Sequence, residues 1–211
     1  MSTSSDPRTL VMHGLRLKGV AEPAAIAEAV DILEAEAKPV LDQLVTDGMA
    51  TYRTGRLSGF SLTRTGREAH AQLLSDELDT TGTRASVQGA YARFRGLNTD
   101  LLTICTAWQL REIDDQPVVN DHADGDYDAA VIGRLADLHA RVAPICEDLG
   151  ATLDRFAGYR PRLSRAVHKV QGGDRDWFTK PMIPSYHTVW FELHEDLLST
   201  LGIERGSEET S

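Results

Sequence analysis

The stretch DGMATYRTGRLSGFSLTRTGREAH, residues 47–70, carries the local signals that decide the fold of the N-terminal part of the chain. MATYR and FSLT are short segments with the composition of strands, and the turn-rich TGRLSG separates them. Gly48 precedes the first segment at a position typical of a left-handed helix cap. The sequence therefore predicts a helix ending at Gly48, then a β-hairpin, then a new helix that begins within TGREAHAQLLSDEL.

This stretch is also basic, although the whole chain of 211 residues has a formal net charge of −10. It holds four arginines and no acidic residue between Asp47 and Glu68. An acidic balance argues against nonspecific polyanion binding. A local basic element can still meet a phosphate, because salt screens distant charges over roughly 10 Å.

Three helices are predicted before the hairpin. The first starts at Pro7, with Asp6 as its cap, and ends at Gly19; the second carries Pro23 in its first turn. The third has one apolar face and ends at Gly48. That face consists of Leu33, Ala37, Val40, Leu41 and Leu44.

The order of three helices and a two-stranded wing resembles the winged helix-turn-helix of MarR-like and PadR-like regulators. The spacing in VLDQLVTDGMATYRTGRLSGFSLTRTGRE is similar to the signature of that family. The matching positions are Leu41, Leu44, Gly48, Arg53, Leu62, Thr63 and Gly66. The resemblance covers residues 7–76, and it implies a helix at 34–47 that reads the major groove and a wing at 53–61 that contacts phosphate or the minor groove.

The predicted reading helix departs from that pattern in its charge. Its outward positions are Glu34, Glu36, Lys38, Asp42, Gln43, Thr46 and Asp47, and carboxylates facing a duplex are repelled by its phosphates. Pro39 is expected to shorten the helix, so that it begins near Ala37. The resemblance then leaves Lys38, Gln43 and Thr46 as readers, with phosphate contacts from Arg53, Arg56, Arg64 and Arg67. The alternative is that these arginines pair with the carboxylates of the third helix.

Residues 77–204 are predicted to form an antiparallel helical bundle. Two seams of apolar residues alternate at spacings of four and three. The first runs through Val87, Tyr91, Phe94, Asn98, Leu101, Cys105 and Trp108, and the second through Val131, Leu135, Leu138, Val142, Ile145, Leu149, Thr152 and Phe156. Pro144 should kink or split the second helix. The seams serve either intrachain packing or a homodimer, which winged-helix regulators commonly need to present two reading heads.

The connector between the seams, residues 112–128, has seven carboxylates and no basic residue. A calcium loop is disfavoured because the required order of acidic positions, glycine and distal glutamate is absent. A solvated loop ending in a helix cap at Asp126 or Asp128 is expected, and a lid remains an alternative. No metal site or cofactor is predicted, and Cys105 and Cys146 are expected to be reduced, buried thiols.

A basic helix and an aromatic segment follow in the C-terminal part. They suggest a site for a small anionic effector, against the alternatives of a solvated basic face and an aromatic core. The candidate effector residues are Arg162, Arg165, Lys169, Trp177, Tyr186 and His187. Ser185 is expected to cap the last helix.

The predicted fold is therefore mainly α, an N-terminal winged helix-turn-helix followed by a helical bundle. Residues 1–6 and 205–211 are expected to be disordered tails. The expected function is transcriptional regulation through double-stranded DNA by a cytoplasmic homodimer. The alternative is an adaptor that binds a protein partner through its acidic third helix. No motif of catalysis occurs, and neither a signal peptide nor a membrane span is expected.

Overall fold

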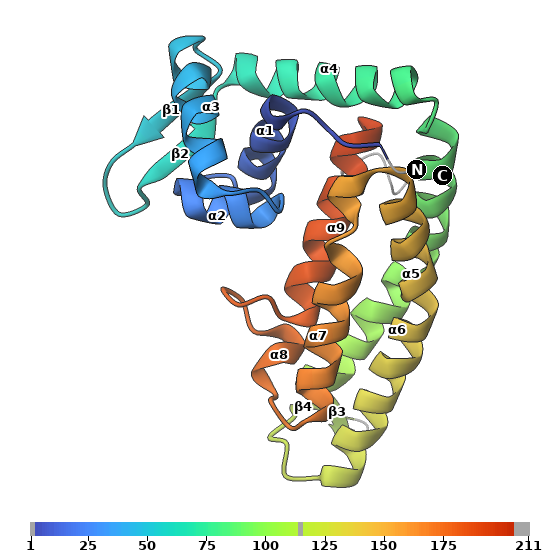
Figure 1. Cartoon of the computed structure of the whole chain (residues 1–211). Coiled ribbons are helices and arrows are strands. Elements are labelled where there is room, and N and C mark those ends of the chain that lie inside the picture. Colours follow the sequence, from blue (N-terminus) through green and yellow to red (C-terminus); the bar gives the residue numbers. More distant parts are fainter. Residues whose placement is uncertain (1–2, 114–115, 205–211) are drawn as a thin grey trace. The chain divides into compact units, whose positions relative to one another are not determined.

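The structure is a computed structural model that describes residues 3–113 and 116–204 (Figure 1). The chain divides into two compact units. The first contains the described residues of Met1–Gln88, Gly150–Gly158 and His194–Ser211, and the second contains those of Gly89–Leu149 and Tyr159–Leu193. The described residues form mostly helices, with two antiparallel hairpins, which confirms the prediction of a mainly α fold.

Three helices open the first unit: α1 (Pro7–Lys18), α2 (Pro23–Ala29) and α3 (Glu34–Thr46). Asp6 caps α1 by accepting hydrogen bonds from the backbone N–H groups of Arg8 and Thr9, as the sequence predicts. Gly48 follows α3 with a φ of 71°, the left-handed conformation expected of a helix-ending glycine. The helix caps predicted at Asp6 and Gly48 are thus confirmed.

The predicted hairpin consists of β1 (Ala50–Arg53) and β2 (Gly59–Leu62), with Ala50 opposite Leu62 and Arg53 opposite Gly59. An antiparallel bridge joins Ala21 to Phe60, so the chain between α1 and α2 lies along the free edge of β2. Figure 1 shows the hairpin beside α1, α2 and α3. The following helix, α4 (Arg64–Thr81), begins directly after β2.

Gly66 allows α4 to approach the backbone of Met49, the residue before β1, closely. A Cβ at this position would lie 1.9 Å from the backbone oxygen of Met49, so no larger residue fits without moving the backbone. The side chain of Thr63 caps α4 by accepting a hydrogen bond from the Gly66 N–H at 3.0 Å, and its hydroxyl lies 2.8 Å from the Gly48 oxygen. The LTRTG motif therefore specifies the close packing between the start of α4 and the backbone of Gly48 and Met49.

Two expectations for α3 are wrong. Leu33 lies before the helix and is 68 % exposed, whereas Ala37, Leu41 and Leu44 are fully buried. Pro39 does not shorten the helix, which begins at Glu34. The Glu36 carboxylate accepts a hydrogen bond from the Leu33 N–H at 3.0 Å, and this cap stabilises the turn before the proline.

The structure also differs from the predicted domain limits. A boundary at residues 76 and 77 would cut the continuous helix α4. Thr3 pairs with Leu153, and Ser5 is buried with its hydroxyl on Glu77, so residues 3–6 are ordered rather than a disordered tail. The tail predicted at 205–211 lies outside the described residues. Hydrogen bonds to segments that are distant in the sequence hold residues 3–6 in place. No local sequence pattern predicts these bonds.

The second unit contains most of α5 (Arg84–Gln109) and α6 (Gly125–Thr152). Arg93 pairs with Asp148 at 2.7 Å and Arg141 pairs with Asp100 at 2.7 Å, so the two helices run antiparallel. Both predicted seams are buried apart from Asn98 and Thr152, which are half-buried. Pro144 does not split α6, because the helix continues past it to Thr152.

The remaining helices are α7 (Tyr159–Gln171), α8 (Asp176–Thr179) and α9 (Tyr186–Leu201), and a short 3₁₀ turn, η1 (Asp154–Phe156), precedes α7. Ser185 caps α9 by accepting from the Thr188 N–H at 3.3 Å, as predicted. Asn98 accepts a hydrogen bond at 3.1 Å from the indole of Trp190, whose ring lies 4.6 Å from that of Phe94 between centroids, tilted by 30°. The polar seam residue is thereby satisfied within its own chain.

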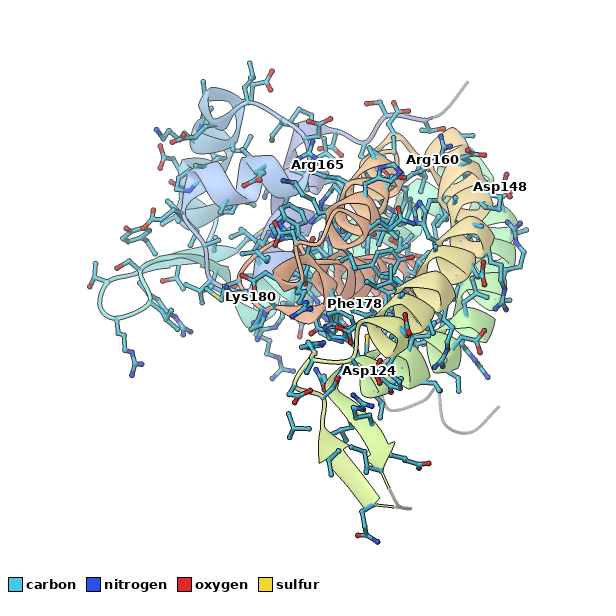
Figure 2. The ribbon with its side chains drawn as sticks, turned by 90° about the horizontal axis from the view of Figure 1, so that it is seen from below. Asp124, Asp148, Arg160, Arg165, Phe178 and Lys180 are labelled. Carbon is cyan, nitrogen blue, oxygen red and sulfur yellow. The ribbon has the colours of Figure 1, made fainter. Side chains whose placement is uncertain are left out.

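The connector after α5 is not the solvated loop that the sequence suggested. It contains a second hairpin, β3 (Leu110–Ile113) paired with β4 (Gln116–Val119). The cap of α6 is Asp124, which accepts from the Tyr127 N–H at 3.0 Å, and neither Asp126 nor Asp128 takes that role. Figure 2 shows Asp124 at the base of this hairpin.

Candidate nucleic-acid interface

The outward face of α3 has the composition that the sequence predicts. All seven predicted outward residues are exposed. Three of the polar groups are engaged within the helix. Lys38 pairs with Glu34 at 2.7 Å, the amide of Gln43 donates to Asp47 at 2.7 Å, and the Thr46 hydroxyl donates to the Asp42 carbonyl at 3.0 Å.

Asp47 at the end of α3 is held by a cation from α1. Arg8 Nη2 lies 2.8 Å from Asp47 Oδ2, and this hydrogen bond, followed by that of Gln43, lowers the pKa of Asp47 below its ordinary value. Part of the acidic charge on α3 is therefore compensated by Arg8 and Lys38. Asp42 has no ion pair within the part of the chain that the structure describes.

The four arginines of the opening stretch do not pair with the carboxylates of α3, so that alternative is wrong for the described residues. Arg64 instead pairs with Glu68 on α4 at 3.0 Å, and Arg67 donates to the Leu62 carbonyl at 3.0 Å. Arg53 and Arg56 are exposed and form no ion pair with any described residue. The hairpin therefore presents two uncompensated guanidinium groups.

Arg53 and Arg67 also share a pocket of about 300 Å³ within the first unit. Arg16 of α1 lines the same pocket, together with Leu15, Gly19, Val20, Ser61 and Leu62. The sequence prediction grouped Arg53 and Arg67 with the wing but missed Arg16, which lies far away in sequence. The pocket thus brings together three arginines from α1, β1 and α4.

A buried polar cluster lies elsewhere in the first unit, and the sequence prediction missed it. His13 and His70 are 1 % and 2 % exposed, and His13 Nδ1 lies 3.2 Å from His70 Nε2. The other imidazole nitrogen of His13 lies 3.0 Å from Asp196 Oδ1. Arg155 Nη1 lies 3.0 Å from the same carboxylate, and Arg155 Nη2 lies 3.0 Å from Glu77.

The cluster is formed by side chains from α1, α4, α9 and η1. Burial, followed by the electrostatic effects of nearby His13, Arg155 and Arg16, lowers the pKa of His70 to about 3, against the opposing effect of Asp196. His70 is therefore neutral in the folded protein at pH 7. Its contact with His13 joins α4 to α1 within the first unit.

The candidate effector residues do not converge on one site. Arg165 and Lys169 line a pocket of about 480 Å³ with Pro161, Ser164 and His168, and Lys169 lies 5.8 Å from the ring centroid of Trp177. Arg162 is engaged by Glu192. Tyr186 is fully buried, 5.9 Å from His139 between ring centroids, so it does not line the pocket. Burial lowers the pKa of His187, which is half-buried.

A second polar cluster in the second unit was also missed. His122 Nδ1 lies 3.0 Å from Asp128 Oδ1, and Asn120 donates to the same oxygen at 2.9 Å. Burial favours a higher pKa for Asp128, but the hydrogen bonds from Asn120 and His122 outweigh it and lower the pKa. Trp108 lies between His122 and Phe178, with ring-centroid distances of 4.3 Å to each (Figure 2 labels Phe178).

No described helix is long and apolar enough to cross a membrane. Among residues 3–113 and 116–204, no group of three or more His, Cys, Asp or Glu side chains is placed to hold a metal ion. Both cysteines are free and buried, as predicted.

Comparison with known proteins adds no relative: no family model, no curated protein and no solved structure matches this chain.

Proposed function

We propose that this protein is a DNA-binding transcriptional regulator that docks through α3 and the β1–β2 hairpin. The observation that carries the proposal is the arrangement of three helices and a hairpin whose Arg53 and Arg56 have no ion pair among the described residues. The Ala21–Phe60 bridge supports it, because it gives the hairpin a third extended segment beside the helices. In a winged helix the third helix enters the major groove and the wing contacts the backbone.

The readers in this proposal are Gln43, Thr46 and Lys38 on α3. Phosphate contacts come from the wing, chiefly Arg53 and Arg56. The acidic residues of α3 oppose binding, but Arg8 and Lys38 compensate Asp47 and Glu34 and reduce this repulsion. The expected affinity therefore depends on the wing more than on the helix.

The helical part supplies dimerisation in this proposal. A second copy would present a second reading head at a distance of one DNA turn. The β3–β4 hairpin supports a contact with a second copy, because Leu110, Ile113 and Val119 are 39 %, 47 % and 78 % exposed. Light scattering of the purified chain tests this, and Val119→Ser should shift the equilibrium towards the monomer. The pocket beside Arg165 and Lys169 is the proposed place of a small anionic effector.

A second function is favoured by the charge of α3. Glu34, Glu36 and Asp42 are exposed on one helix, and a basic protein partner would complement them better than a duplex does. In that function the chain is an adaptor without DNA binding. The two functions differ in the molecule that the hairpin arginines contact, which is a DNA duplex in the first and a protein partner in the second.

The decisive experiment is capture of genomic fragments by the purified full-length protein at low salt, followed by titration of a recovered fragment at several salt concentrations. The double variant Arg53→Ala, Arg56→Ala should lower the slope of log K against log salt by about two, since each phosphate contact contributes roughly 0.9. Arg160→Ala, on the second unit, is the matched control and should leave the slope unchanged. Recovery of no fragment above background would favour the adaptor.

A further inference from the structure

The pocket between α1, β1 and α4 has the composition of a site for a doubly charged oxyanion. Its lining contains three guanidinium groups, from Arg16, Arg53 and Arg67, and no carboxylate. Arg16 Nη2 also lies 3.6 Å from Glu195 Oε2, and Glu195 does not line the pocket. Three cations around a pocket of about 300 Å³ create a local positive potential in an otherwise acidic chain.

Ser61 gives an independent indication of a ligand. It lines the same pocket and is 6 % exposed, yet its hydroxyl has no hydrogen-bond partner among the described residues. Buried hydroxyl groups are nearly always hydrogen-bonded in folded proteins, because an unsatisfied one loses its hydration without compensation. An oxyanion in the pocket would accept this hydrogen bond.

The hairpin register places Ser61 and Arg53 together. Ser61 lies opposite Thr51 and Arg53 lies opposite Gly59, so the side chains of Ser61 and Arg53 project from the same face of the hairpin. Arg67 of α4 is held at the pocket by its Nη1, which donates to the Leu62 carbonyl at 3.0 Å. This bond leaves the remaining N–H groups of Arg67 for a ligand.

We infer that Arg16, Arg53, Arg67 and Ser61 form a binding site for a phosphate group, as inorganic phosphate or as a small phosphate monoester. Guanidinium groups match the tetrahedral oxyanion geometry with paired N–H donors, and a dianion is preferred over a carboxylate by three cations. The volume lies at the small end of ligand pockets, which suits a phosphate group rather than a large ligand. The inference does not depend on the proposed DNA binding.

The test is a titration of the full-length protein with inorganic phosphate, followed by calorimetry or by NMR of arginine side chains. Sodium chloride keeps the ionic strength constant, and no DNA is present. We expect saturable binding of one phosphate. Arg16→Gln should weaken it about tenfold and Ser61→Ala about threefold, because each removes a hydrogen bond to a charged ligand.

Arg160→Ala is the control, since Arg160 is an exposed arginine on α7 that does not line the pocket. It should leave phosphate affinity unchanged. Lack of saturable binding in the wild type would overturn the inference, as would equal weakening by Arg160→Ala and Arg16→Gln. Circular dichroism of each variant identifies loss of fold, and Ser61→Ala, the smallest change, keeps the test decisive if Arg16→Gln unfolds.

A second arm distinguishes the source of the phosphate group. If a recovered DNA fragment is displaced by phosphate more strongly than by chloride at equal ionic strength, a backbone phosphate occupies the pocket in the complex. If it is not displaced, the ligand is a free small anion. Saturable phosphate binding without recovery of any DNA fragment would support the pocket and contradict the proposed regulator.

Discussion

His13 Nδ1 lies 3.2 Å from His70 Nε2 in the interior of the first unit, with neither ring more than 2 % exposed. At this separation one nitrogen donates and the other accepts, so protonation of both rings would set two N–H groups against each other. Arg155 adds a further positive charge nearby. The pair is therefore a source of acid sensitivity in the folded protein.

Stability should fall between about pH 6.5 and pH 3 through His70. Its pKa is about 3 in the folded protein and about 6.5 for an ordinary histidine in the unfolded chain, so the unfolded chain binds the proton first as pH decreases. The stabilisation is complete above pH 6.5 and is lost as pH falls towards 3. Urea unfolding at pH 7.5, 6 and 5 measures this loss of stability. Over the whole range down to pH 3 the loss is on the order of a few kcal/mol.

His70→Asn should remove this part of the pH dependence, because asparagine does not titrate. The carboxylates contribute equally in both proteins, so the difference between the two curves isolates His70. Identical pH dependence of wild type and variant would contradict the assignment.

Gly66→Ala should destabilise the first unit strongly, by about 3 kcal/mol or more. The new Cβ would meet the Met49 oxygen at 1.9 Å, and backbone on both sides prevents an easy adjustment. Gly89→Ala is the control, since Gly89 lies in α5 with open space around its Cβ position. That substitution should stabilise by up to about 1 kcal/mol through helix propensity. Thermal unfolding compares the two, and similar effects of both would refute the close approach of α4 to the Met49 backbone.

Arg155→Met should cost about 3–5 kcal/mol, because it leaves two carboxylates buried without their cation. The Arg155 side chain is 1 % exposed and contacts Glu77 and Asp196. Arg160→Met breaks the exposed pair with Glu147 and should cost less than about 1 kcal/mol. Chemical denaturation provides both values. A small loss for Arg155→Met would mean that water replaces its contacts.

Both thiols should be inert in the native protein. Burial raises the pKa values of Cys105 and Cys146 to about 12, so very little thiolate exists at pH 8. A disulfide reagent should react with neither thiol in buffer and with both in denaturant. Rapid native labelling of either cysteine would contradict its burial.

Much of the first unit could be predicted from residues 7–76 because its signals are local. Asp6 and Gly48 act on the backbone within a few residues, and the Thr63 and Gly66 pair marks the start of α4 within one turn. The second hairpin was missed because it lacks such local signals. Its strands are four residues long, mostly exposed, and carry no alternation of buried and exposed residues.

The candidate sites divide in the same way. The exposure of the outward residues of α3 follows from helical periodicity, and it was predicted correctly. The partners of their charges were not, because Arg8 reaches Asp47 across 39 positions of sequence. The proposed effector set failed as a unit, since Tyr186 packs inside while Arg165 remains outside.

The sequence alone determined where the helices of the first unit begin and end and which of their faces are apolar, because caps, glycines and periodicity act through neighbouring residues. Only the tertiary structure decided which charges meet. It brought Arg16 to Arg53 and Arg67 around the buried Ser61 hydroxyl, and it placed His13 beside His70 and Asp196. Which groups form ion pairs or hydrogen bonds depends on distances of a few ångströms in space. These distances cannot be read from the separation of the residues along the chain.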